Sequence, residues 1–283
     1  MAQNIYDNPT FFEAYAKFRR SAIGLDGAPE WAALRAMLPP MAGLRMVDLG
    51  CGYGWYCRWA REAGAASVLG LDLSGRMLAR ARADTADPAI RYQRTDLDRL
   101  ELPEAAFDLA YSSLALHYVA DFDRLVGVVR RALVAGARPA ARFVFSIEHP
   151  LFMAPSRPEW LTLADGRRAW PLDAYNREGA RTTDWLVQGV VKHHRTLATT
   201  LNTLIGHGFA IRRVEEWSPT ADQIAAIPEI SEELDRPIFL LVAAELPALR
   251  QSRRDPPPMT LSPRPQPRSG EEPGSPYRHP LKK

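Results

Sequence analysis

The stretch that decides the fold is VDLGCGYGW, residues 47–55, in which an apolar run meets three alternating glycines. A turn of this kind between a strand and a helix lets the main chain approach a ligand closely. A dinucleotide-binding turn has its third glycine five positions after the first, whereas this chain has Trp55 there. Asp48, just before the turn, would repel a pyrophosphate but suits a ligand with an ammonium group or hydroxyls. The turn therefore favours a cationic amino-acid ligand over a nicotinamide dinucleotide.

The rest of the chain, outward from this turn, alternates between strand and helix patterns. Helical spacing covers residues 53–63, 74–84 and 121–133. Seven short apolar runs predict strands, at residues 44–49, 67–73, 90–96, 107–113, 141–148, 210–217 and 236–246. This alternation predicts an α/β fold, with a doubly wound, mostly parallel, seven-stranded Rossmann-like sheet that has an antiparallel last strand and helices on both faces.

Composition and charge narrow the class of protein. The chain has 283 residues, of which 46% are hydrophobic and 24% charged, as expected of a globular protein with a sizeable core. Its net charge of +3 is concentrated in residues 250–283, so the remainder is slightly acidic and does not favour nucleic acid as a partner. The apolar runs are too short to span a membrane, the first residues lack a secretory pattern, and the two cysteines predict neither a disulfide framework nor a metal site. We therefore expect a cytoplasmic protein.

The same features divide the chain into parts. Residues 250–283 are rich in proline and arginine and poor in large aliphatic residues, which predicts a disordered tail. Residues 1–249 are expected to form one domain, with N-terminal cap helices in residues 1–40. Residues 150–191 form an insertion that holds three of the seven tryptophans. These aromatic residues predict either a substrate lid for a planar or apolar acceptor or a plug over the open edge of the sheet.

The glycine turn and the acids that follow it resemble the signature of class I S-adenosylmethionine-dependent methyltransferases of the bacterial small-molecule type. In that family an acid precedes alternating glycines, and further acids end the second and third strands; here these acids are Asp48, Asp72 and Asp96. The resemblance implies S-adenosylmethionine as the cofactor, with Asp72 on the ribose hydroxyls and Asp96 and Leu97 on the adenine. The cofactor-binding residues expected from it are Asp48, Gly50, Cys51, Gly52, Gly54, Asp72, Leu73, Met77, Asp96, Leu97 and Ser112.

The N-terminal residues 11–19 have helical spacing and resemble the cap helix that closes over the cofactor in this group. Tyr15 and Arg19 would share one face of that helix and could reach the carboxylate of the cofactor. An ordinary packing helix is the alternative interpretation.

Two further segments predict local features of the fold. Residues 192–206 have the apolar stripe of a helix. Residues 133–142 replace the Pro-Gly-Gly turn that the family usually has before the fifth strand, and they are longer and lack paired glycines. We therefore expect a local distortion where the fifth strand enters the sheet.

Methyl transfer is an in-line displacement, which needs alignment and sometimes a base. Two histidines follow strands whose carboxyl ends should border the site, His117 after the fourth strand and His149 after the fifth. Either could be the general base; the alternatives are that His117 only packs beside the cofactor and that His149 only shapes the turn before Pro150. The candidate substrate-binding residues are Glu148, Trp170, Tyr175 and His194.

The function predicted on this basis is transfer of a methyl group from S-adenosylmethionine to a small-molecule acceptor, aromatic or apolar in character. The alternatives are a nucleic-acid or protein methyltransferase, a dinucleotide-binding oxidoreductase, and a non-catalytic protein that binds the cofactor. The fourth strand ends in Tyr111-Ser112-Ser113-Leu114, without the Asp/Asn-Pro-Pro-aromatic motif of enzymes that methylate amino groups of DNA.

Overall fold

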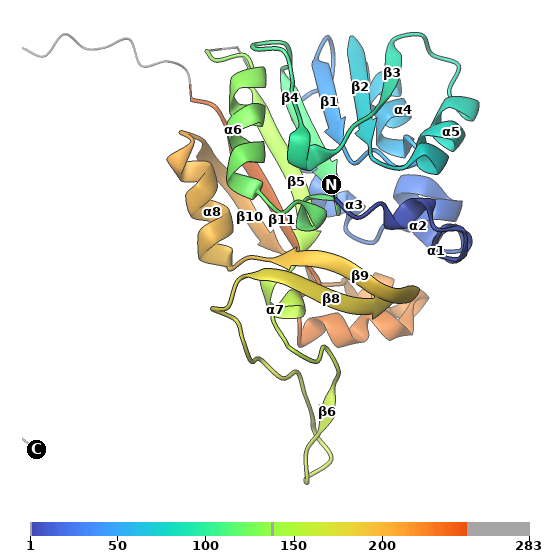
Figure 1. Ribbon diagram of the computed structural model, residues 1–283, viewed down its shortest axis with the longest axis vertical. Helices are drawn as coiled ribbons and strands as arrows, with labels where there is room; N and C mark the ends of the chain where they lie inside the picture. The colour runs from blue at the N-terminus through green and yellow to red at the C-terminus, as the bar shows by residue number, and fades with distance from the viewer. Residues whose placement is uncertain (1, 137–138, 248–283) are drawn as a thin grey trace, which may run out of the picture. The chain divides into compact units, whose positions relative to one another are not determined.

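The computed structural model describes residues 2–136 and 139–247, so the predicted tail at residues 250–283 lies outside the described part of the chain. A seven-stranded sheet forms the centre, in the order β10-β11-β5-β4-β1-β2-β3 (Figure 1). Strands β1 to β5 are parallel, whereas β11 is antiparallel to both β5 and β10. The strands are β1 (Arg45–Leu49), β2 (Ser67–Asp72), β3 (Ile90–Arg94), β4 (Leu109–Ser113), β5 (Arg142–Glu148), β10 (Ala210–Glu216) and β11 (Phe239–Glu245). The predicted fold class and its seven strands are confirmed.

Helices cover both faces of this sheet because its strands alternate their side chains between two apolar cores. In β1, Met46 packs toward one core while Val47 and Leu49 pack toward the other. The first core contains side chains of α3 (Trp31–Arg35), α4 (Trp55–Glu62) and α5 (Gly75–Ala83); the second contains those of α6 (Phe122–Ala132) and α8 (Leu197–Gly206). The three helices predicted between strands are therefore confirmed within one or two residues at each end.

The helix predicted over residues 192–206 is wrong in its first part. Residues up to His194 belong to strand β9 (Val187–His194), and α8 starts only after Thr196, whose side chain accepts a hydrogen bond from the backbone N–H of Thr199. In β9, residues 190, 192 and 194 are buried and their neighbours are more exposed. The predicted helix thus joined two elements: the end of a strand, in which every second residue is buried, and the helix that follows it.

The insertion after β5 contains more regular structure than the sequence suggests. It holds α7 (Pro150–Met153), a small pair β6 (Leu161–Thr162) and β7 (Arg168–Ala169), and a long antiparallel hairpin of β8 (Gly179–Trp185) and β9. Figure 1 shows this hairpin crossing the carboxyl edge of the sheet, next to the N-terminal helices. Buried Val190 packs there with Ile5 and Phe11, so the hairpin and the N-terminal segment form one roof.

The N-terminal part of this roof is a series of short elements rather than one helix. They are η1 (Ile5–Asp7), α1 (Pro9–Tyr15), α2 (Arg19–Ala22) and η2 (Gly24–Gly27). Since α1 ends at Tyr15, the single helix predicted over residues 11–19 is wrong. The remaining elements are η3 (Leu97–Arg99), η4 (Leu116–Tyr118), α9 (Ala221–Ala226) and η5 (Pro228–Leu234).

The segment in which a distortion was expected before the fifth strand is only partly described, and β5 itself is regular. Residues 137–138 are outside the described part of the chain, and from Arg142 onward β5 pairs in unbroken register with β4 and β11. The chain order reverses at β1, which lies between β2 and β4. In open α/β sheets ligands bind beyond the carboxyl ends of strands at such a reversal. Within the described residues, no helix is both long and apolar enough to cross a lipid bilayer.

Candidate active site

A cavity of about 650 Å³ lies at this carboxyl edge, beneath the roof. One half, which we call the glycine-loop half, is lined by Gly50, Gly52, Asp72, Leu73, Met77, Asp96 and Leu97. The other, which we call the aromatic half, is lined by His117, Glu148, Met153, Trp185, Lys192 and Phe239. The segments that follow the five parallel strands β1 to β5, the roof and the start of β11 therefore meet in one space.

The glycines after β1 serve different purposes. Gly52 has a φ of +52°, which glycine adopts without strain, and a Cβ at this position would meet no atom within 4 Å. Gly52 also lines the cavity, so a ligand there can approach its main chain. Gly54, with a φ of +72°, is needed for a different reason, since a Cβ there would lie 2.1 Å from the hydroxyl of Tyr92. Gly54 does not line the cavity.

Asp72 ends β2 and turns its carboxylate toward the glycine loop. Its Oδ2 accepts a hydrogen bond from the backbone N–H of Gly52 at 2.9 Å, and its Oδ1 accepts one from that of Ser74 at 2.8 Å. Burial raises the pKa of Asp72. A carboxylate has about four acceptor positions, so two remain for hydroxyls of a ligand. The predicted role for Asp72 is compatible with this geometry.

The far end of the glycine-loop half has a polar corner between apolar walls. Asp96 begins η3, where its Oδ1 accepts from the backbone N–H of Asp98 at 3.0 Å and its Oδ2 accepts from that of Ala2 at 3.3 Å. Leu73 and Leu97 supply apolar surface beside it. Such a corner suits a planar heterocycle with an exocyclic amino group.

Three residues predicted to bind the cofactor support the loop from beneath instead. Asp48 is 2% exposed, and its Oδ2 accepts a hydrogen bond from the thiol of Cys57 at 3.3 Å. Burial raises the pKa of Asp48 to about 7. Ser112 donates a hydrogen bond to the carbonyl of Leu49 at 2.6 Å, which ties β4 to β1. Cys51 is buried as well, and none of these three predicted residues lines the cavity.

The structure brings Tyr15 into the cavity but not Arg19. Because α1 ends at Tyr15 and a turn follows, the two side chains do not share a helix face, and Arg19 is exposed. Arg20 lines the cavity in its place. Its guanidinium pairs with the carboxylate of Glu30 at 3.0 Å, and the Glu30 side chain is 1% exposed. Arg19, which the predicted helical spacing selected, therefore lies outside the cavity, and its neighbour Arg20 lines it.

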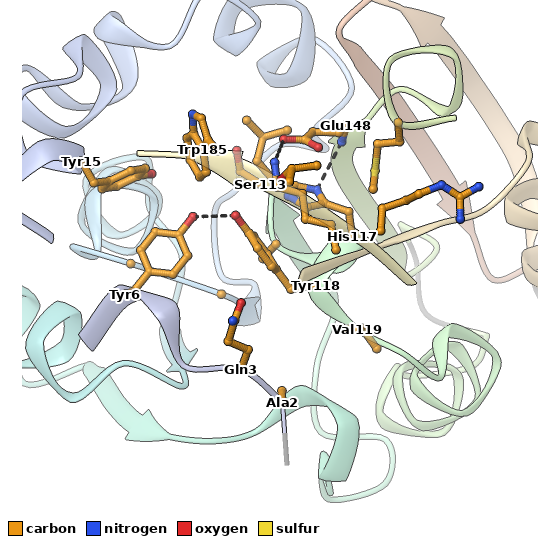
Figure 2. A pocket seen from close by; sticks show the side chains of 18 of the residues that line it. Ala2, Gln3, Tyr6, Tyr15, Ser113, His117, Tyr118, Val119, Glu148 and Trp185 are labelled. Carbon is orange, nitrogen blue, oxygen red and sulfur yellow. Dashed lines mark hydrogen bonds and ion pairs between the residues drawn. The ribbon is translucent and has the colours of Figure 1, made fainter. Parts of the chain in front are cut away.

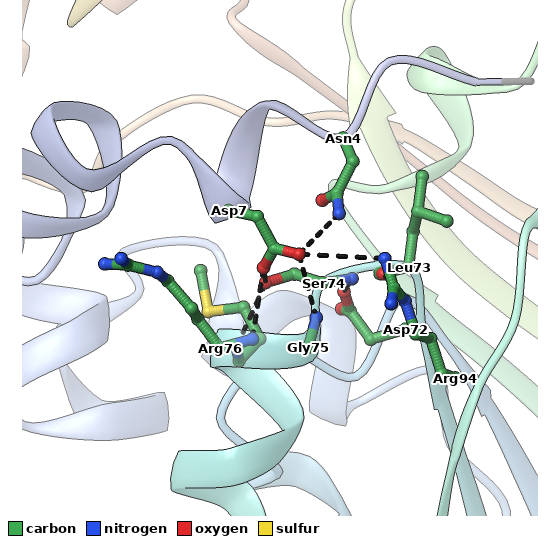
Figure 3. A network of polar contacts seen from close by, with 9 residues as sticks. Asn4, Asp7, Asp72, Leu73, Ser74, Gly75, Arg76 and Arg94 are labelled. Atoms are coloured by element: carbon green, nitrogen blue, oxygen red, sulfur yellow. Dashed lines mark hydrogen bonds and ion pairs between the residues drawn. The ribbon is translucent and has the colours of Figure 1, made fainter.

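The roof is fastened to the sheet through Asp7 (Figure 3). The Asp7 carboxylate accepts hydrogen bonds from the hydroxyl of Ser74 at 2.6 Å and from the backbone N–H groups of Gly75 and Arg76 at 3.3 and 3.1 Å. The amide of Asn4 donates to it at 2.6 Å. Burial opposes ionisation, but these hydrogen bonds outweigh it and lower the pKa of Asp7. An anion at the N-terminus of α5 is also favoured by the helix dipole.

In the aromatic half, His117 and Glu148 are neighbours (Figure 2). The Nδ1 atom of the His117 ring accepts a hydrogen bond from the backbone N–H of Glu148 at 3.3 Å. The Glu148 carboxylate pairs with the ammonium of Lys192, whose side chain is 5% exposed. This ammonium lies 4.6 Å from the ring centroid of Trp185. The predicted substrate residue Glu148 therefore does line the cavity.

His149 is held in a structural position. Its Nδ1 accepts a hydrogen bond from the backbone N–H of Leu151 at 3.0 Å, so it caps α7, and its Nε2 lies 3.0 Å from the carboxylate of Glu216. Both ring nitrogens are engaged, and the side chain does not line the cavity. We therefore withdraw His149 as a candidate base, in favour of the turn-shaping alternative.

The other three predicted substrate residues pack the insertion. The indole N–H of Trp170 donates to the carbonyl of Leu151 at 2.9 Å. The Nε2 atom of His194 lies 2.8 Å from the carbonyl oxygen of Tyr175, and His194 is fully buried. Trp170, Tyr175 and His194 do not line the cavity.

Sequence reasoning missed the residues of the aromatic half that come from distant segments. They are Lys192 and Phe239; Arg20, at the boundary with the glycine-loop half, was missed as well. Trp185 belongs to the insertion whose tryptophans were expected to form a lid or a plug. Lys192 is buried on the same side of β9 as Val190, and this alternation is visible only in the folded strand. We find no local pattern that singles out Arg20 or Phe239, because their roles depend on tertiary packing.

Comparisons with known proteins agree with this geometry. A model of the methyltransferase domain matches residues 47–140. The structure is similar to that of an S-adenosylmethionine-dependent methyltransferase from Mesorhizobium loti, at 64% identity and a TM-score of 0.75, over 78% of this chain and 100% of that chain. It is also similar to a second structure of this description from Listeria monocytogenes, at 40% identity and a TM-score of 0.72, over 79% of this chain and 99% of that chain.

A third match extends over less of the molecule. Malonyl-[acyl-carrier protein] O-methyltransferase of Pectobacterium atrosepticum is 34% identical over 152 residues, which are 53% of this chain and 51% of that protein. This chain therefore matches about half the length of that relative. Together, the matches confirm the predicted enzyme class and the predicted cofactor, S-adenosylmethionine, in place of a nicotinamide dinucleotide. The chain belongs to the S-adenosylmethionine-dependent methyltransferases.

Proposed function

We propose that this enzyme methylates a small molecule with an apolar or aromatic body, bound in the aromatic half of the cavity. The observation that carries the proposal is the cavity itself, whose two halves are continuous and whose volume of about 650 Å³ lies in the range of small-molecule sites. The roof of N-terminal segment and hairpin covers it, which disfavours a nucleic-acid strand or a folded protein as acceptor. Phe152, Trp185 and Phe239 supply apolar surface for such a ligand.

S-adenosylmethionine supplies an electrophilic methyl carbon attached to a sulfonium. We propose that the main chain at Gly50 and Gly52 cradles its amino-acid part and that Asp72 accepts hydrogen bonds from its ribose hydroxyls. The open space at Gly52 and the two acceptor positions left on Asp72 fit these roles. Asp96, with Leu97, Leu73 and Met77 around it, would hold the adenine. Tyr15 and Arg20 face the same cavity, so we assign the cofactor carboxylate to Arg20 in place of Arg19.

The remaining work of the protein is alignment and exclusion of water. Displacement at a methyl carbon requires the nucleophile, carbon and sulfur to be in line, and positioning alone can lower such a barrier by several kcal/mol. The roof is suited to this task, because Asp7 and Val190 fasten its two parts to the sheet and to each other. We further propose that residues 1–249 form the catalytic domain, with residues 1–40 and the insertion 150–191 as its cover.

The size of the acceptor can be tested by labelling. A bacterial extract is separated into a fraction below about 1 kDa and a macromolecular fraction, and each is incubated with the enzyme and tritiated S-adenosylmethionine. We expect enzyme-dependent label in the small fraction, and none with the Gly52→Val variant. Label confined to protein or nucleic acid would contradict the proposal.

A further inference from the structure

The polar groups that face the aromatic half are mostly hydrogen-bond donors. Tyr6 and Tyr118 lie with their hydroxyls 3.3 Å apart (Figure 2). Burial raises the pKa of both phenols well above the usual range, so they remain protonated. Among the other polar side chains that line the cavity, His117, Lys192 and Glu148 lie together in this half. The charge state of these last three decides what the site can hold.

His117 presents an N–H group to this space. Its Nδ1 accepts the hydrogen bond from the backbone of Glu148, so the lone pair is on Nδ1 and the proton of the neutral ring is on Nε2. The opposite tautomer would point Nδ1–H at the backbone N–H. Within residues 2–136 and 139–247, no group accepts a hydrogen bond from Nε2. His117 therefore offers a donor to a ligand and lacks the free lone pair that a general base needs.

Three cationic side chains act on His117. Burial lowers the pKa of His117 well below its ordinary value, and the charges of Lys192, Arg195 and Arg20 lower it further. These cations come from β9, the segment after it and α2, while Glu148 at the end of β5 supplies the carboxylate that faces them. That carboxylate is already paired with Lys192.

Lys192 retains donors for a ligand. An ammonium has three N–H groups, and among the described residues Glu148 is its one hydrogen-bond partner. The side chain is 5% exposed and lines the cavity, with the Trp185 ring beside it. A buried ammonium and the His117 N–H thus border the same space, next to apolar walls.

We propose, on the basis of the function proposed above, that the acceptor is an organic carboxylate with an apolar or aromatic body, and that its ionised oxygen, held by His117 and Lys192, receives the methyl group. The carboxylate oxygen forms the new bond to the methyl carbon. The bond between that carbon and sulfur breaks, and its electron pair stays on sulfur. The negative acceptor and the positive sulfonium become a neutral ester and a neutral thioether, and no proton moves. The reaction therefore needs donors at this position and no general base.

The test compares matched ligands on the enzyme loaded with S-adenosylhomocysteine. Calorimetry measures the affinity for phenylacetate, indole-3-acetate and isovalerate, and for the amide of the same skeleton in each case. Mass spectrometry after incubation with S-adenosylmethionine detects the methyl ester. We expect at least one carboxylate to bind at least tenfold more tightly than its amide and to form the ester.

Variants assign this preference to the residues named. In Lys192→Met the preference should fall below about threefold, whereas Lys17→Met, which removes an exposed lysine outside the cavity, should keep it. His117→Phe provides a second variant, and the affinity for S-adenosylhomocysteine checks that each protein is folded. Amides that bind as tightly as the carboxylates, a panel in which no carboxylate binds, or a preference that survives in Lys192→Met would overturn the proposal. If wild-type enzyme fails to bind S-adenosylhomocysteine, the proposed function fails with it.

Discussion

The two halves of the cavity are built by different means. In the glycine-loop half, main-chain geometry and carboxylates come from consecutive strand ends within residues 47–97, where β1, β2 and β3 pair in order. In the aromatic half, single side chains come from segments as distant in sequence as His117, Lys192 and Phe239. The first is a local pattern that any member of the fold can carry, and the second is particular to the tertiary structure of this chain. The difference indicates that cofactor and acceptor recognition can be altered separately.

The greatest change is predicted for Asp48, which lies beneath the glycine loop, and it distinguishes this acid from Asp72, which lines the glycine-loop half. Burial raises the pKa of Asp48 to about 7, against 3.8 for the unfolded chain, so the folded state holds more protons between these values. Stability should therefore fall as the pH rises from about 4 to about 7, by on the order of 4 kcal/mol through this group. Asp48→Asn should flatten that fall and leave the affinity for S-adenosylhomocysteine within about threefold.

Urea unfolding of both proteins between pH 4 and pH 8 measures this difference. If the free energies of unfolding of wild type and Asp48→Asn follow the same slope with pH, Asp48 is ionised in the folded protein. A loss of ligand affinity in Asp48→Asn would place this acid in the binding site after all.

Asp72→Asn should weaken cofactor binding by about 30- to 100-fold. Hydrogen bonds to a charged acceptor contribute about 1.5–3 kcal/mol, and the substitution removes the charge while keeping the size of the side chain. Calorimetry with S-adenosylhomocysteine gives the affinity, and circular dichroism verifies that Asp72→Asn is folded. Unchanged affinity in a folded variant would remove Asp72 from the ribose site.

Substitutions of Arg20 and Arg19 test which of the two arginines binds the carboxylate of the cofactor. Arg20→Gln should raise the Kd for S-adenosylhomocysteine about tenfold, because it removes one charge-assisted hydrogen bond to the carboxylate. Arg19→Gln is the matched control, since Arg19 is exposed and one residue away, and its Kd should stay at the wild-type value. Equal effects of the two substitutions would show that neither arginine meets the carboxylate.

The smallest effect is expected for His149→Ala. Removal of a side-chain cap costs about 1 kcal/mol, which corresponds to a fall in Tm of about 2–4 °C for a domain of this size. Methyl transfer to the acceptor should continue at close to the wild-type rate. A variant that keeps its Tm but loses turnover would restore His149 as a catalytic candidate.

The sequence predicted the glycine-loop half of the cavity better than the aromatic half. The seven strands and the glycine loop are local patterns, and they were predicted with correct order and nearly correct bounds. Gly52, Asp72 and Asp96 lie in the cavity because strand ends place them there. Trp170 and His194 lie outside the cavity because the folding of the hairpin and the insertion sets the direction of their side chains, and no short-range sequence period predicts that folding. Arg19 lies outside it because α1 ends one turn earlier than predicted, at Tyr15.

In the proposed cofactor site, the open space at Gly52 forms the floor. Calorimetric titration with S-adenosylhomocysteine of wild type, Gly52→Val and Gly43→Val tests it directly. Gly43 is the matched control, because its φ is +78°, a Cβ there also meets no atom within 4 Å, and it lies outside the cavity. We predict micromolar binding by wild type and Gly43→Val and at least about 100-fold weaker binding by Gly52→Val, a difference of about 2.7 kcal/mol. Binding by Gly52→Val equal to that of wild type, or no binding by wild type, would contradict the account.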